Sequence, residues 1–147
     1  MSDTTRANPI AILLVEDNAG DVRLMMETFR EGRICKQIFV VEDGVEALAL
    51  LRHDGKYSSI PRPDLILLDL NLPRKSGQEL LAEIKQDPDL KRIPVVVITS
   101  SQAEKDIIES YNNHANCYLI KPIGLEEFTG LVRSVEEFWL SVVKLPP

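Results

Sequence analysis

The sequence predicts a single doubly wound α/β domain, a five-stranded parallel sheet with helices on both faces. Two observations support this. Five short apolar runs without alternating polar residues recur along the 147-residue chain, which is typical of strands buried on both faces of a parallel sheet. Segments of helical period separate these runs, and an alternation of strand and helix in one small domain implies right-handed crossovers. The length fits one domain.

Each element has its own signal. The strands are predicted at residues 11–15, 38–41, 65–68, 95–98 and 118–120. Apolar residues at helical spacing mark the helices between them, the fifth of which begins near Leu125: Val22, Leu24 to Met26 and Phe29; Val45, Leu48 and Leu51; Leu80, Leu81 and Ile84; and Ile107, Ile108 and Tyr111. Three helix starts carry the capping-box spacing: Asp43 with Glu46, Ser76 with Glu79, and Ser101 with Glu104.

Composition excludes several classes of function. The net charge is −6 and the longest basic run is Arg74-Lys75, so nucleic-acid binding is not expected. The longest apolar run, residues 10–15, is far shorter than the ~20 residues that span a bilayer, and we expect no membrane insertion. The polar N-terminus lacks the apolar stretch of a signal peptide, which predicts a cytoplasmic protein. Cys35 and Cys117 have no paired metal or redox spacing and are predicted to be reduced.

Charged and hydroxyl side chains follow the predicted strands. Glu16 and Asp17 follow the first strand, Asp69 the third, Thr99 the fourth and Lys121 the fifth. In a doubly wound sheet, ligands bind beyond the carboxyl ends of the strands. Three crowded carboxylates favour Mg²⁺, which typically works with phosphate while a lysine neutralises the remaining charge. Carboxylates are nucleophiles in aspartyl-phosphate formation, and Asp69, on a rigid strand end, is the predicted acceptor.

These motifs resemble the receiver domain of two-component response regulators. The resemblance covers about residues 10–138 and implies a flavodoxin-like receiver fold, which functions in phosphorelay signal transduction and not as an enzyme on small molecules. It depends on the order and spacing of five motifs: Glu16-Asp17; Asp69 with Asn71 and Pro73; Thr99; Tyr118; and Lys121-Pro122.

The resemblance assigns the metal site. By it, Asp69 is the phosphoacceptor, and Asp17 and Asp69 coordinate Mg²⁺ directly. Glu16 would coordinate through water, and Asn71 through its backbone carbonyl. Two alternatives come from the residues alone: Asp69 could cap the turn at Asn71, and Glu16 with Asp17 could be the acidic start of a helix.

The resemblance also assigns a switch. Lys121 would contact the phosphoryl group, Thr99 would move to hydrogen-bond it, and Tyr118 would change rotamer in response. The peptide bond before Pro122 is expected to be cis. Without the family, Thr99 could cap the fourth helix and Tyr118 would be assigned to the core.

The connection at residues 53–63, the segment 87–94 and residues 138–140 are similar to those of stand-alone regulators associated with bacterial phytochromes. The resemblance therefore implies a sensor histidine kinase as partner, of phytochrome-like type, and a downstream protein target or phosphotransfer protein. Two rival functions remain. One is a phosphatase or phosphotransferase that uses Asp69 as nucleophile on small molecules, which would want a second acid where Asn71 stands; the other is an interaction module that does not use phosphorylation.

The last helix carries more apolar surface than one buried face requires. If the helix is continuous, its apolar positions cover roughly 160°, against the ~100° stripe of a helix packed on one side. We therefore expect a homodimer through the fourth and fifth helices; the alternative is that the tail folds back on its own domain. The predicted organisation is a flexible segment at residues 1–9, a receiver domain at 10–140, and a tail at 141–147 that can join the dimer interface. The interface residues are predicted to be Phe138, Trp139, Val142 and Leu145.

Overall fold

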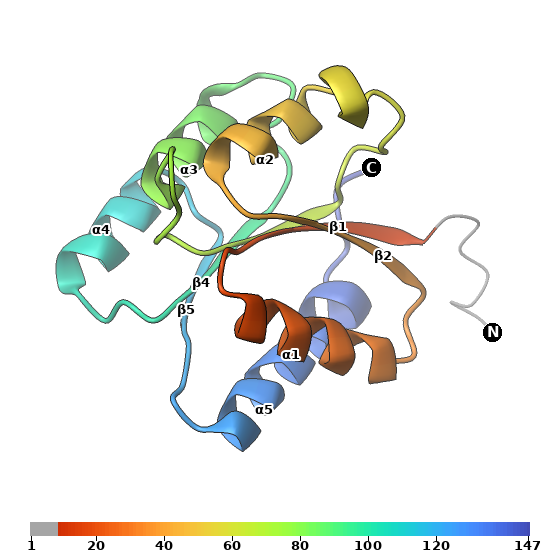
Figure 1. The fold of residues 1–147 in the computed structure, drawn as a ribbon, viewed down its shortest axis with the longest axis vertical. Helices are drawn as coiled ribbons and strands as arrows, with labels where there is room; N and C mark the ends of the chain where they lie inside the picture. The colour runs from red at the N-terminus through yellow and green to blue at the C-terminus, as the bar shows by residue number, and fades with distance from the viewer. Residues whose placement is uncertain (1–8) are drawn as a thin grey trace.

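The five apolar runs form the central sheet of the computed structural model, which describes residues 9–147. The strands run parallel in the order β2-β1-β3-β4-β5, and the predicted sheet is confirmed (Figure 1). Of the N-terminal segment predicted at residues 1–9, all but Pro9 lies outside the described residues. The strands are β1 (Ile10–Val15), β2 (Lys36–Val41), β3 (Leu65–Leu68), β4 (Val95–Thr99) and β5 (Cys117–Ile120).

Burial differs between the middle and the edges of the sheet. Every residue of β1, β3 and β4 is buried, as continuous apolar runs predict. The edge strands β2 and β5 are only partly buried, so the prediction of burial on both faces is wrong for them. Each edge strand has a single neighbour, and the helices cover the margins of the sheet less completely than its centre.

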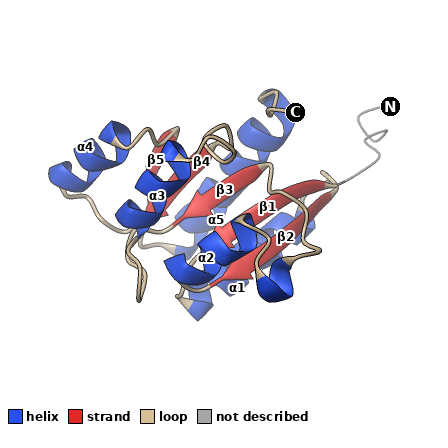
Figure 2. Ribbon diagram, turned by 90° about the horizontal axis from the view of Figure 1, so that it is seen from above, coloured by secondary structure: helices blue, strands red, loops and turns tan. Residues whose placement is uncertain are grey.

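Helices cover both faces of the sheet (Figure 2). One face carries α1 and α5, which pack on each other and on one apolar cluster; α2 and α3 cover the opposite face, with α4 beside α3 and β5. Within the described chain, no helix combines the length and the hydropathy that a bilayer crossing requires. The helices are α1 (Ala19–Glu31), α2 (Gly44–Leu51), α3 (Gly77–Gln86), α4 (Glu104–Asn112) and α5 (Leu125–Val135), with a short 3₁₀ helix at Gly55–Tyr57.

Two of the three predicted caps are confirmed. The side chain of Asp43 caps α2, and Ser76 forms a complete capping box on α3. The third is wrong, because α4 begins after Ala103 with no side-chain cap. The Ser101 hydroxyl instead accepts from the Ala103 amide at 3.2 Å and donates to Asp106 at 2.5 Å. Ser101 therefore stabilises the loop before α4.

The chain after α5 is a π-helical segment, Glu136–Val142, whereas the apolar spacing predicts that the α-helix continues through these residues. This register buries Leu140 and leaves Phe138 and Val142 exposed. Trp139 and Leu145 pack against the cluster beneath α1 and α5. Trp139 and Leu145 thus contribute part of their surface to the chain's own core, as the alternative of a tail folded back on its domain predicts, while the predicted dimer stays a prediction.

Candidate functional site

Three carboxylates meet at the carboxyl ends of β1 and β3. Glu16 and Asp17 follow β1, and Asp69 follows β3, next to it in the sheet. Backbone hydrogen bonds fix both strand ends, since the Glu16 amide donates to Val41 and the Asp69 amide to Val15, each at 3.0 Å. Oxygen atoms of the three carboxylates lie within 4.8 Å of one another. Glu16 and Asp69 are buried and Asp17 is exposed, so the cluster opens to solvent on the Asp17 side.

Both oxygens of Asp69 have partners. Oδ1 accepts from the Asn71 amide at 3.1 Å and from the Thr99 hydroxyl at 2.9 Å, and Oδ2 accepts from Lys121 Nζ at 3.0 Å. Burial alone would raise the pKa of Asp69, but the Asn71 amide, the Glu16 side chain and Lys121 outweigh it and lower that pKa. Asp69 is therefore held as a carboxylate, the form in which it can act as a nucleophile.

Lys121 lies at the centre of the acidic cluster. Its Nζ donates to Glu16 at 2.6 Å, to Asp21 at 2.8 Å and to Asp69 at 3.0 Å. Burial would lower the pKa of Lys121, but these three hydrogen bonds raise it above its usual range. Burial raises the pKa of Glu16 to about 7; the hydrogen bond from Lys121 opposes this shift, and the charge of Asp69 adds to it. One ammonium thus serves three carboxylates.

Asp21 is the site residue that the sequence analysis missed. It lies in the first turn of α1, where Asn18 caps the helix by accepting from the Asp21 amide at 2.9 Å. An acid in a first turn is common because it complements the helix dipole, and this common explanation conceals its contact with Lys121. The signal was available: a helix that begins directly after β1 brings its first turn to the same edge of the sheet.

The remaining predicted residues surround Asp69 at different depths. Thr99 is fully buried, whereas Asn71 is exposed on the loop after β3. Tyr118 is half-buried against the cluster under α2 and α3, as its core alternative predicted, and its hydroxyl donates to the Ser101 carbonyl at 3.0 Å. That bond joins β5 to the loop before α4.

The prediction of a cis peptide bond before Pro122 is wrong. None of the peptide bonds in residues 9–147 is cis, and the Lys121-Pro122 bond is therefore trans. The trans form remains favoured by about 0.5–1 kcal/mol even before proline. A backbone hydrogen bond fixes the position of Lys121, because its amide donates to the Thr99 carbonyl at 2.7 Å.

The donor set fits a hard divalent cation. Glu16, Asp17 and Asp69 supply carboxylate oxygens within reach of one ion, and Lys121 is paired with Glu16, Asp69 and Asp21. Four acids around one ammonium leave an excess of negative charge. Oxygen-only donors suit Mg²⁺ or Mn²⁺ and not the soft metals that thiolates bind.

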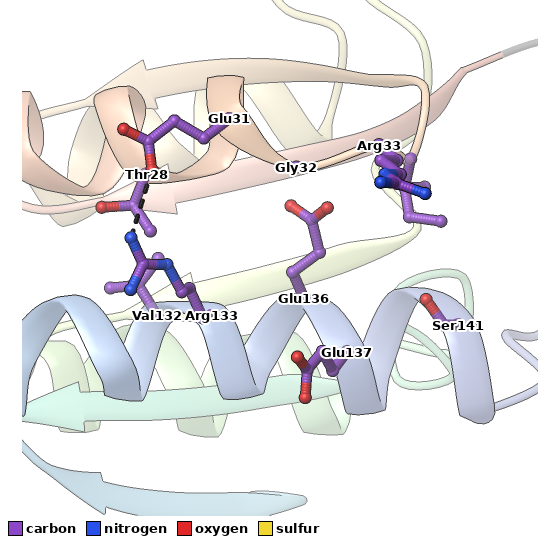
Figure 3. A pocket seen from close by; sticks show the side chains of 10 residues that line it. Thr28, Glu31, Gly32, Arg33, Val132, Arg133, Glu136, Glu137 and Ser141 are labelled. Atoms are coloured by element: carbon purple, nitrogen blue, oxygen red, sulfur yellow. Dashed lines mark hydrogen bonds and ion pairs between the residues drawn. The ribbon is translucent and has the colours of Figure 1, made fainter.

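A groove of about 400 Å³ lies at the other end of α1, between that helix and the C-terminal helix (Figure 3). Glu136 points across it toward Gly32, and Arg133 lies 3.4 Å from Glu31. The buried Glu136 carboxylate is ion-paired with Lys36 at 3.0 Å. Two of the acids that line the groove, Glu31 and Glu136, thus have cationic partners within the chain, whereas the acids at the strand ends outnumber the one ammonium among them.

The fold and the strand-end cluster together define a class of protein. A family model for the response regulator receiver domain matches residues 12–133, and the chain belongs to that family. This is a signalling family of two-component systems and not a class of conventional enzymes.

Relatives of known structure narrow the similarity to phytochrome-associated regulators. The chain is 51% identical over 146 residues to response regulator Rcp1 of Synechocystis sp., with 99% of each chain covered. It is similar to the crystal structure of Mn²⁺-bound Rcp1 (52% identity, TM-score 0.92, covering 95% of this chain and 100% of that one). The phosphorylated cyanobacterial phytochrome response regulator RcpA is equally similar (51% identity, TM-score 0.92, the same coverage). The receiver fold is thus confirmed, and the relatives include one metal-bound and one phosphorylated protein.

Proposed function

We propose that this chain is a single-domain response regulator that accepts a phosphoryl group from a sensor histidine kinase on Asp69 in a Mg²⁺-dependent reaction. The observation that carries the proposal is the environment of Asp69: a buried carboxylate with a lowered pKa, 3.0 Å from an ammonium and within 4.8 Å of two further acids. The metal-bound and phosphorylated relatives support the same assignment.

The chemistry is a transfer between two protein groups. As the bond between phosphorus and the kinase histidine nitrogen breaks, a bond forms to an Asp69 oxygen, giving an aspartyl phosphate. Asp17, Asp69 and the Asn71 carbonyl would hold Mg²⁺, with Glu16 through water, and the ion would neutralise phosphoryl charge when bound. Lys121, which in the resting protein satisfies three carboxylates, would then turn to the phosphoryl oxygens.

The switch follows from the partners of Asp69. The Thr99 hydroxyl donates to Asp69 Oδ1, and we expect it to donate to the phosphoryl group after transfer. A rotamer change of Tyr118 would break its 3.0 Å hydrogen bond to the Ser101 carbonyl and release the loop before α4. Phosphorylation would thereby change the contacts offered to a downstream target or phosphotransfer protein.

Similarity to a phytochrome response regulator favours a phytochrome-like kinase as partner. The kinase domain that phosphorylates its own histidine uses ATP, so we expect this protein to act in the cytoplasm.

We also expect a homodimer that uses the exposed part of the predicted interface, Phe138 and Val142. Light scattering of wild type and Phe138→Glu, each with and without a phosphoryl analogue, tests the dimer; a monodisperse wild-type monomer in both states would refute it.

Intact mass spectrometry after incubation with a small phosphodonor and Mg²⁺ tests the central proposal. Wild type should gain one phosphoryl mass that hydroxylamine removes, because an acyl phosphate is labile to that nucleophile. Asp69→Asn should gain none, and Asp89→Asn, which alters an exposed aspartate away from the cluster, should behave as wild type. An adduct on Asp69→Asn would move the acceptor elsewhere. No adduct on wild type would favour a module that binds partners without phosphorylation.

A further inference from the structure

The loop between β3 and α3, residues 69–76, carries two residues of the proposed metal site, Asp69 and Asn71. It begins at a buried strand end and finishes at the capping box of α3. The backbone hydrogen bonds of this segment are local: the Leu72 amide at 3.2 Å and the Gly77 amide at 3.0 Å both donate to the Leu70 carbonyl. The orientation of the Asn71 carbonyl therefore depends on what holds the middle of this loop.

Arg74 holds the middle of the loop to α2. Its Nη2 donates to Asp43 Oδ1 at 3.1 Å and lies 3.6 Å from Glu46 Oε2. The backbone of Arg74 has φ of +66°, in the left-handed region that non-glycine residues rarely adopt. A residue stays in that region when its surroundings fix it, and here the surroundings are the acidic N-cap residue of α2 and an acid of its first turn.

The acceptors of Arg74 are themselves fixed. Asp43 caps α2 by accepting from the Glu46 amide at 2.8 Å. Glu46 accepts from the Tyr57 hydroxyl at 2.5 Å and lies 3.6 Å from Lys56. The guanidinium of Arg74 thus joins the loop to a preformed acidic pair at the start of α2.

Backbone packing brings the loop and α2 together at the same place. A Cβ added at Gly44 would lie 2.7 Å from the Lys75 carbonyl oxygen. That distance is shorter than real Cβ contacts, so the absence of a side chain at Gly44 permits the close approach. The loop therefore meets α2 through the backbone of Lys75 and through the guanidinium of its neighbour.

We propose that Arg74 is a positioning residue of the metal site, which fastens the loop to the start of α2 and so orients the Asn71 carbonyl toward the cation. The inference rests on the proposed function, because it assumes that Asn71 is a metal ligand. Arg74 acts through the loop and has no contact of its own with the acidic cluster.

The sign of the effect separates positioning from simple charge. A cation near a metal site repels the metal, so removing Arg74 would strengthen Mg²⁺ binding if only its charge mattered. Positioning predicts the opposite. Lys56 is a matched control, because its ammonium lies at the same 3.6 Å from Glu46 but is not part of the loop.

The test measures Mg²⁺ affinity by isothermal titration calorimetry for wild type, Arg74→Ala, Arg74→Lys and Lys56→Ala. We expect Arg74→Ala to bind Mg²⁺ about three- to ten-fold more weakly, at or below the low end of the roughly 10–100-fold loss usual for outer-sphere partners, because Arg74 is half exposed. Arg74→Lys should be intermediate, since it keeps a charge but not the planar fork. Lys56→Ala should bind as wild type or slightly more tightly.

Hydrogen exchange of the metal-free proteins gives a second measurement. Amides of residues 70–77 should exchange several-fold faster in Arg74→Ala, with α5 unchanged, while Lys56→Ala should match wild type. Equal or tighter Mg²⁺ binding by Arg74→Ala, or unchanged exchange of the loop, would overturn the inference. Absence of Mg²⁺ binding by wild type would refute the proposed function instead, and phosphorylation of wild type together with an unaffected Arg74→Ala would refute the inference alone.

Discussion

Replacing Lys121 tests whether its ammonium is the counter-charge of the acidic cluster in the resting protein. In Lys121→Met the apolar stem is kept, so packing changes little while three charge-assisted hydrogen bonds are lost. Two of the carboxylates left behind, Glu16 and Asp69, are 2% and 6% exposed. Removing one partner of a buried ion pair costs about 3–5 kcal/mol.

We expect Lys121→Met to lower the free energy of unfolding by about 3 kcal/mol, the lower end of this range. Asp21 is partly exposed and can be hydrated, and Glu16, with its pKa already at about 7, can take up a proton. At about 2–4 °C per kcal/mol for a chain near this size, the melting temperature should fall by roughly 6–12 °C. The control Lys56→Met removes an exposed ammonium and should change stability by less than about 0.5 kcal/mol.

Urea unfolding followed by circular dichroism, in EDTA and in excess Mg²⁺, measures both effects. Mg²⁺ should narrow the difference between Lys121→Met and wild type, because the added cation supplies charge to the same carboxylates and binds only the folded chain. A Lys121→Met protein as stable as Lys56→Met in EDTA would contradict the reasoning. A difference that Mg²⁺ leaves unchanged would show that the ammonium and the metal do not share these carboxylates.

Three further predictions concern other parts of the chain. The hydrogen bond from the Glu46 amide and the ion pair with Arg74 lower the pKa of Asp43 despite its partial burial, so its charge stabilises the fold above pH 3.8 and this contribution is lost as the pH falls through the lower folded value. Thermal unfolding of Asp43→Asn, which keeps the cap, should show a loss of about 0.5 kcal/mol at pH 7 that becomes smaller as the pH falls below 3.8; a loss that does not change with pH would contradict the charge argument. Glu136→Gln should lower the free energy of urea unfolding by about 2 kcal/mol, because the buried ammonium of Lys36 loses its charged partner, and no loss would refute that role. By the same measurement Leu140→Ala should cost about 2–4 kcal/mol, whereas a cost below 1 kcal/mol would contradict the π-helical register.

The middle of the fold could be predicted from the sequence because burial on both faces leaves a simple pattern. For β3 the predicted bounds, residues 65–68, match the structure. The same pattern overstates burial at β2 and β5, since an apolar run does not reveal whether a strand lies at an edge. A position in the sheet order is a tertiary property, and the run itself carries no information on it.

The candidate site could be predicted as far as strand ends define it. Glu16, Asp17 and Asp69 meet because parallel strands end at one edge, which follows from the fold class. Asp21 was missed because it reaches the cluster from a helix, and Ser101 was misassigned because a capping-box spacing also fits a loop hydrogen bond. A serine three residues before an acid can cap a helix, but here its hydroxyl bonds Ala103 and Asp106 instead, and local spacing does not distinguish the two outcomes.

The C-terminal register could not be predicted from hydrophobic spacing. Apolar residues at intervals of three and four fit an α-helix through residue 142, but the structure changes to π-helix at Glu136. The buried carboxylate of Glu136 is ion-paired with Lys36 there, and Gly32 makes room for it, since an added Cβ would lie 1.7 Å from Glu136 Oε2. This pairing spans a hundred residues of sequence, and a helical pattern does not report it.

The resting site and the proposed switch use the same hydrogen bonds. Asp69 accepts from Thr99 at the end of β4 through Oδ1 and from Lys121 just after β5 through Oδ2, so the oxygen that bonds to phosphorus changes its contact with one of these two residues. Tyr118, on β5, bonds the loop before α4 and lies between this change and the exposed face of α4. On the proposed function, phosphorylation therefore acts first on the contacts that Asp69 makes with residues of β4 and β5, whereas Glu16 and Asp17 lie after β1. The location of the response follows from which strands supply the partners of Asp69.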